Sequence, residues 1–150
     1  MSTELYIRYA ESLLAVTGTG MLLDPLHGQV TKAFAPVGYP SLFPVATGAW
    51  KLAIVALNFV EDGKYSQYGQ WMLATLMGGA IWHHAVGEGH PAASVAPLVF
   101  LGLSAAVPYL QNKAPLPMAI AAALACAAGG FAIGHLLPKS KKSAAKKEKK

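Results

Sequence analysis

Three long runs without charge constrain this chain more than any other feature of its sequence. Tyr65–Gly87, Gly89–Asn112 and Ala114–Pro138 contain 23, 24 and 25 residues, and none of them holds Asp, Glu, Lys or Arg. A helix needs about 20 mostly apolar residues to cross a bilayer. A soluble domain of 150 residues has too little interior to bury three such runs in succession. The runs therefore predict membrane-spanning helices, because a chain in lipid must satisfy its own backbone hydrogen bonds.

Two weaker apolar segments precede these runs. Residues 5–23 contain Arg8 and Glu11, and residues 42–60 contain Lys51. Either segment alone would also suit an amphipathic helix at the membrane surface. Beside three strong runs, we interpret both as membrane helices whose polar residues face the bundle. The predicted fold class is all-α, a transmembrane helical bundle with five spans at about 5–23, 42–60, 68–87, 94–110 and 117–137.

The positive charge of the chain is concentrated at its C-terminal end. The formal net charge is +5, yet residues 139–150 hold seven Lys and one Glu, which leaves five basic and six acidic residues in 1–138. A nucleic-acid-binding domain would spread Lys and Arg over a folded face, so we expect no nucleic-acid partner. Residues 1–138 are interpreted as the membrane domain. Lys139–Lys150 are interpreted as a disordered tail, either solvated or bound to anionic lipid headgroups.

The tail also sets the predicted orientation. The positive-inside rule keeps it in the cytoplasm, and an odd number of spans then places the N-terminus on the opposite side. The linkers give no independent support. Arg8, Lys64 and Lys113 fall on the predicted lumenal side, and Lys32 falls on the other.

Two motifs resemble the DoxX-like membrane family. Residues 37–52 contain Gly-Tyr-Pro at 38–40 and Gly-Ala-Trp-Lys-Leu at 48–52. Residues 78–88 contain Gly-Gly-Ala, then His-His at 83–84 and Val-Gly-Glu, similar to the acetylcholine-receptor chaperone branch of that family. Tyr9, Glu11 and the glycines at 18 and 20 fit its first helix loosely. The resemblance covers about residues 5–110.

The resemblance implies four DoxX-like helices, to which this chain adds a fifth. Bacterial members are named for a subunit associated with thiosulfate–quinone oxidoreduction, and an animal branch assists assembly of ion-channel subunits in the endoplasmic reticulum. The implied function is therefore a non-catalytic accessory or assembly factor for another membrane protein, in the endoplasmic reticulum or another endomembrane, with an organellar membrane as the alternative. The alternative functions are a membrane subunit of a quinone- or haem-linked redox system, and an accessory subunit of a respiratory or photosynthetic complex that holds a haem or pigment.

Glu11 and Lys51 are the first candidates for a polar site inside the membrane. An ionisable side chain near the bilayer centre costs at least about 2.5–3.5 kcal/mol, so it usually has a partner or a cavity. On antiparallel helices in a core of about 30 Å, the two residues lie about 8 Å apart along the axis, which a long lysine could nearly close. The alternative is that each side chain extends to its nearer headgroup layer.

His83, His84 and Glu88 lie at the predicted cytoplasmic end of the third span. Adjacent helical residues point about 100° apart, so we expect the two histidines not to face one small ligand. His84 and Glu88 would share a face if the helix continued, but Gly87 and Gly89 predict that it stops. Structural histidines, proton handling and ligation of haem or metal are all open interpretations, and the sequence predicts no metal site.

Small residues in the last span are the remaining feature. Gly129, Gly130 and Gly134 allow close helix approach, either inside this bundle or against another membrane protein. Because this helix lies beyond the family resemblance, it is our first candidate for partner packing. The sequence contains no recognisable nucleophile–base arrangement, so we assign no catalytic residue and no firm cofactor.

Overall fold

The structure is a computed structural model that describes residues 2–23 and 28–137. Within these ranges the chain is helical and contains no strand. This finding confirms the predicted all-α class. The predicted lysine-rich tail, Lys139–Lys150, lies outside the described residues.

Three helical segments are long and apolar enough to cross a membrane. They are Phe43–Gly63, Pro91–Leu110 and Leu116–Leu136, each 20 or 21 residues long. Their outer surfaces carry large exposed apolar side chains, such as Leu98 and Leu124. Contiguous apolar surface of this kind suits lipid rather than water. The segments coincide with the predicted spans at 42–60, 94–110 and 117–137.

The other two predicted spans are not single regular α-helices. The first is divided into α1 (Thr3–Glu11) and α2 (Leu13–Leu22) at Ser12, whose hydroxyl donates to the carbonyl oxygen of Tyr9 at 2.5 Å. A serine that bonds back to its own helix often bends it. The third consists of α6 (Ser66–Trp82) followed by a π-helical turn, η3 (His83–Gly87). The count of five spans stays a prediction.

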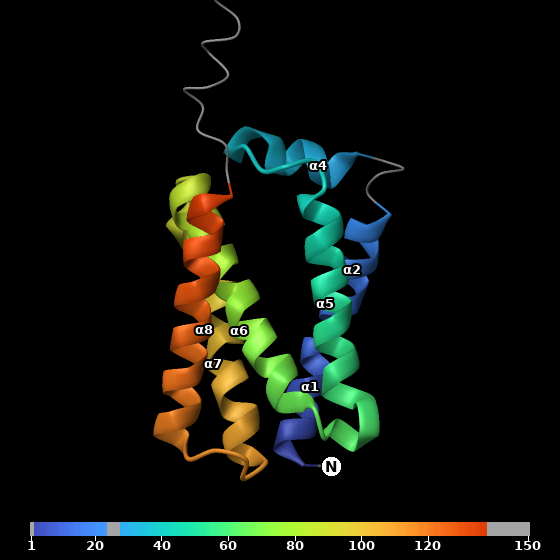
Figure 1. The fold of residues 1–150 in the computed structure, drawn as a ribbon, viewed down its shortest axis with the longest axis vertical. Helices are drawn as coiled ribbons and strands as arrows, with labels where there is room; N and C mark the ends of the chain where they lie inside the picture. The colour runs from blue at the N-terminus through green and yellow to red at the C-terminus, as the bar shows by residue number, and fades with distance from the viewer. Residues whose placement is uncertain (1, 24–27, 138–150) are drawn as a thin grey trace, which may run out of the picture.

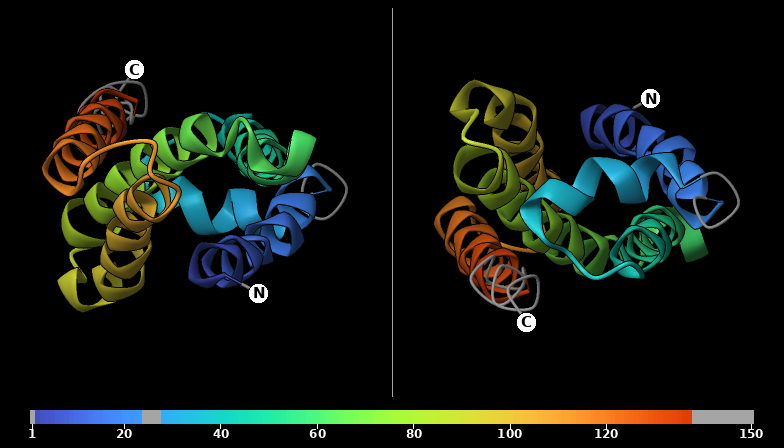
Figure 2. Two further views of the ribbon diagram at one scale, coloured as in Figure 1. Left: turned by 90° about the horizontal axis from the view of Figure 1, so that it is seen from below. Right: turned by 90° about the horizontal axis from the view of Figure 1, so that it is seen from above.

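The helices form two groups that α6 connects. α2 packs along α5 (Phe43–Phe59), while α6 packs along α8 (Leu116–Leu136) and α7 (Val95–Leu110), and α6 also contacts α5 (Figure 1). The short helix α4 (Gln29–Phe34) lies across one end of the bundle, as both views along the helices show (Figure 2). The start of α1 and the end of α8 lie at opposite ends (Figure 1).

Glycines set the close approach of α6 and α8. A Cβ atom at Gly78 would overlap the backbone carbonyl of Ala127, and one at Gly130 would overlap the carbonyl of Thr75. Gly134 likewise faces α6, where an added Cβ would lie 3.2 Å from the side chain of Trp82. Small residues at such a contact let helix backbones approach each other in a membrane.

This packing distinguishes the two interpretations of the glycines in the last span. Gly130 and Gly134 were candidates for partner packing, but both are buried against α6. The contact between α6 and α8 leaves no room for a side chain at either position. Gly129, the third candidate, is exposed, and a Cβ atom there would meet nothing within 4 Å.

Candidate functional site

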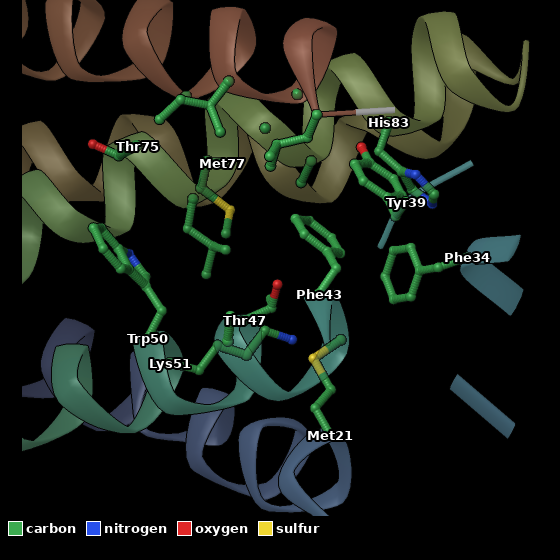
Figure 3. Close-up of a pocket in the computed structure, with 18 of the residues that line it drawn as sticks. Met21, Phe34, Tyr39, Phe43, Thr47, Trp50, Lys51, Thr75, Met77 and His83 are labelled. Atoms are coloured by element: carbon green, nitrogen blue, oxygen red, sulfur yellow. The ribbon is translucent and has the colours of Figure 1, made fainter. Parts of the chain in front are cut away.

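A cavity of about 420 Å³ lies between α5 on one side and α6 and α8 on the other. Its volume falls in the range of about 300–1,000 Å³ that is usual for small-molecule sites. Figure 3 shows side chains of both walls, with Thr47, Trp50 and Lys51 on α5 and Thr75 and Met77 on α6. The lining is mostly aliphatic and aromatic, so the cavity suits an apolar molecule.

Aromatic rings close the end of the cavity beneath α4. Phe34 of α4 lies 5.5 Å from Phe43 and 4.9 Å from His83, measured between ring centroids. Tyr39 stacks on Phe43 with centroids 4.1 Å apart. Burial, assisted by the negative charge of Glu88, raises the pKa of Tyr39 to about 12. The phenol therefore stays neutral and keeps its proton for hydrogen bonding.

Lys51 places a cationic group on the cavity wall. Its Nζ donates to Oγ1 of Thr17 on α2 at 3.1 Å. The close contact of α2 with α5 makes this bond available, because Gly18 and Gly48 leave no side chain between the two helices. Lys51 does not form the pair with Glu11 that was one of the two alternatives, because the hydrogen bonds of Glu11 go to Asn58 and Gln70.

Glu11 belongs to a separate, fully buried polar cluster. Its Oε2 accepts from the side-chain nitrogen of Asn58 at 2.9 Å and from that of Gln70 at 2.6 Å, and all three side chains have no exposed surface. The Gln70 nitrogen also lies 3.0 Å from Oδ1 of Asn58. None of the three residues lines the cavity. The cluster ties α1, α5 and α6 together, which is a structural role.

Two cations lie near this cluster at the end of the bundle. Arg8 is 5% exposed, and its guanidinium lies 5.2 Å from the ring centroid of Phe59. Lys113 donates to the carbonyl oxygen of Gly63 at 2.9 Å and to the hydroxyl of Ser66 at 3.0 Å. Burial, together with the charge of Arg8, lowers the pKa of Lys113.

His83, His84 and Glu88 form a third polar group, beside the aromatic end of the cavity. Nε2 of His83 lies 3.3 Å from Oε1 of Glu88, and Nδ1 of His84 lies 2.7 Å from Oε2. The hydrogen bond with His84 is the main cause that lowers the pKa of Glu88, with the nearby charge of His83 assisting. Both histidines also line the cavity.

This arrangement corrects the expectation that the two histidines cannot face one small ligand. The expectation assumed regular α-helix, which η3 is not. The backbone N–H of Glu88 bonds the carbonyl of His83 at 2.8 Å, five residues back, so the helix continues as a π turn and carries Glu88 to both rings. The helix ends at Gly87, as Gly87 and Gly89 predict, and Glu88 follows it as the C-cap residue.

The structure thus separates the predicted polar residues into two places. Lys51, His83 and His84 share one cavity, with Glu88 bonded to the histidines, whereas Glu11 lies in the cluster with Asn58 and Gln70. We had not assigned those two amides to a site, although each is a polar residue inside an apolar run, which is a usable signal in a membrane protein.

Comparisons of the chain with protein-family models, with curated proteins and with solved structures find no match. The resemblance to the DoxX-like family therefore rests on the sequence motifs. The residues that carry those motifs gather in space, because Tyr39, Trp50, Lys51, His83 and His84 all line the cavity. The cavity is consequently the leading candidate for the functional site.

Proposed function

We propose that this protein is an accessory membrane subunit whose cavity binds a lipophilic molecule that carries a ring and hydrogen-bond acceptors, with the quinone class as the best chemical fit. The observation that carries the proposal is the cavity itself, where a lysine and a histidine stand on otherwise apolar, aromatic walls. Apolar walls with a few placed polar groups are the usual design of small-molecule sites.

The placement of the polar groups supports a molecule with acceptors at two edges. Lys51 lies on the α5 wall, and His83 lies on the α6 side close to Phe34 and Tyr39 (Figure 3). The Nδ1 atom of His83 is buried and has no hydrogen-bond partner within residues 2–23 and 28–137. A quinone presents two carbonyl oxygens on opposite sides of its ring. One oxygen could accept from Lys51 while the other accepts from His83.

Quenching of tryptophan fluorescence by a short-chain quinone tests this proposal. Trp50 lines the cavity, so a bound quinone should quench its emission in a saturable way. A hydrogen bond to a charged group is worth about 1.5–3 kcal/mol, so Lys51→Leu should raise the Kd by about tenfold or more. Lys64→Leu is the matched control, because Lys64 is exposed and does not line the cavity.

Two results of the same titration would contradict the proposal. Quenching that rises linearly with quinone concentration, as simple partition into detergent gives, would mean that there is no site. Saturable quenching with the same Kd in Lys51→Leu and in the unchanged protein would remove Lys51 from it.

A second proposal is that α8 packs against a helix of a membrane partner, as expected of an assembly factor. Ala121, Ala125 and Gly129 are exposed at intervals of four residues, so they share one outward face. In mild detergent, Gly129→Leu should abolish co-purification of the partner. Gly102→Leu on α7 is the control, since a Cβ at Gly102 also meets nothing within 4 Å. A strictly monomeric unchanged protein would contradict this proposal.

We further propose the five-span topology, with four DoxX-like helices and one more, a cytoplasmic C-terminus, and location in the endoplasmic reticulum or another endomembrane. The opposite placement of the start of α1 and the end of α8 supports an odd number of crossings (Figure 1). A membrane-impermeant thiol reagent applied to sealed vesicles tests it. In a Cys126→Ser background, Ser2→Cys and Ser143→Cys should label from opposite sides, and labelling from one side would contradict it.

A further inference from the structure

We infer that His83, His84 and Glu88 form a binding site for a divalent transition-metal ion at the end of the cavity beneath α4. This site goes beyond the proposed function, and it does not depend on any molecule in the cavity. It also goes beyond the sequence-based interpretation, which left metal ligation by these histidines open and assigned no metal site.

The first argument is the distance between the ligand atoms. One imidazole nitrogen from each histidine and one carboxylate oxygen of Glu88 all lie within 4.8 Å of one another. Around a tetrahedral zinc ion with bonds of about 2.0–2.1 Å, ligand atoms lie about 3.4 Å apart. The separation of His83 Nε2 and Glu88 Oε1 is already 3.3 Å, and that of His84 Nδ1 and Glu88 Oε2 is 2.7 Å. Small side-chain rotations would therefore complete the site.

The second argument is that the backbone and the neighbouring rings hold these ligands in place. Glu88 bonds through its N–H to the carbonyl of His83, and the N–H of His90 bonds the carbonyl of His84, both at 2.8 Å. The His83 ring also lies against Phe34, with centroids 4.9 Å apart. Single π-helical turns in α-helices occur frequently at functional sites. A preformed site of this kind loses little entropy when an ion binds.

The third argument is the chemistry and accessibility of the donor set. Two imidazoles and one carboxylate match three-ligand zinc sites and the facial triads of non-haem iron, whereas calcium and magnesium prefer oxygen ligands. The side chains of His84 and Glu88 are 30% and 34% exposed, so an ion can enter from water. Both histidines line the cavity, so the remaining coordination position can lie on that side.

Metal titration of the full chain tests the inference. The protein, purified in mild detergent without a histidine tag and stripped with a chelator, is titrated with Zn²⁺ by calorimetry and with Co²⁺ by visible absorption. We expect saturable binding of one ion per chain and d–d bands typical of nitrogen and oxygen ligands. Loss of one ligand should weaken binding by more than tenfold in His84→Asn and in Glu88→Gln, since even the loss of a residue that only hydrogen-bonds to a ligand costs about 10–100-fold.

His135→Asn is the matched control, because His135 lies on α8 outside this group of ligands. It should bind Zn²⁺ as the unchanged protein does. The inference is overturned if the unchanged protein shows no saturable binding. It is also overturned if both ligand variants bind with unchanged affinity, or if only His135→Asn loses binding. The Co²⁺ spectrum of the unchanged protein tests the donor set even if a variant does not fold.

Discussion

The side-chain nitrogen of Gln70 lies 2.6 Å from a carboxylate oxygen of Glu11, so a hydrogen bond joins α6 to α1 across 59 residues of sequence. The same nitrogen reaches Asn58 on α5 at 3.0 Å. All three side chains are fully buried. Inside a membrane no water can replace a lost hydrogen-bond partner, so breaking these bonds is costly. The cluster therefore fixes the relative position of three helices.

Replacement of Gln70 by leucine should therefore destabilise the fold. Gln70→Leu removes a donor from Glu11 and leaves Asn58 Oδ1 without its Gln70 contact, at a cost of about 2–3 kcal/mol in the free energy of unfolding. Unfolding in mixed micelles of increasing denaturing-detergent content measures that free energy. Gln29→Leu on the exposed surface of α4 is the control and should change it little. Equal stability of the two variants would show that the cluster contributes nothing.

Addition of a single methyl group at Gly78 should separate α6 from α8. The Cβ of Gly78→Ala would overlap the backbone carbonyl of Ala127, which no side-chain rotation can relieve. Overpacking of this kind typically costs about 1–3 kcal/mol and sometimes more. Gly129→Ala makes the same chemical change on α8 where nothing lies within 4 Å, so its Tm should equal that of the unchanged protein. A Tm loss of the same size in both variants would contradict this account of the contact.

Much of the fold could be predicted from the runs of sequence that contain no charged residue. The runs 89–112 and 114–138 predicted helices that the structure places at α7 and α8, because a long apolar run in a helix is constrained by the bilayer rather than by neighbours. The partners of Glu11 could not be predicted in this way. Depth along the axis made Lys51 a plausible partner, but the direction in which each side chain points depends on how the helices pack.

The histidine group shows the same limit at a smaller scale. Regular α-helical geometry argued against a shared ligand for His83 and His84. Gly87 and Gly89 argued that the helix stops before His84 and Glu88 can share a face. A π turn adds one residue to the hydrogen-bonded ring and so rotates the side chains that follow it. No local sequence pattern predicted this turn. The cavity could not be predicted from the sequence either, since its walls come from helices that are far apart in the chain.

Trp50 should contribute a hydrogen bond between the two groups of helices. Its Nε1 donates to the backbone carbonyl of Met72 on α6 at 3.0 Å. Trp50→Phe keeps an aromatic ring but removes the donor, so we expect a loss of about 1 kcal/mol in the free energy of unfolding. Trp71→Phe is the control, because the ring contact of Trp71 is with Tyr68 on the same helix and joins no other helix. A larger loss in Trp71→Phe than in Trp50→Phe would argue against this role.

Glu88 should make stability depend on pH in the acidic range. The hydrogen bond with His84 holds the pKa of the Glu88 carboxyl below its ordinary value of 4.5 in the folded state. A lowered pKa means that the folded state binds its proton less readily, so the stabilisation is present above pH 4.5 and is lost as the pH falls through the lowered value. The difference in the free energy of unfolding between the metal-free protein and Glu88→Gln should therefore be present just above pH 4.5 and should close below it. Its size should stay under about 1 kcal/mol, because the pair is partly exposed to solvent. In a His84→Asn background the pH dependence should shrink, and a difference that stays constant down to pH values well below 4.5 would contradict the assignment.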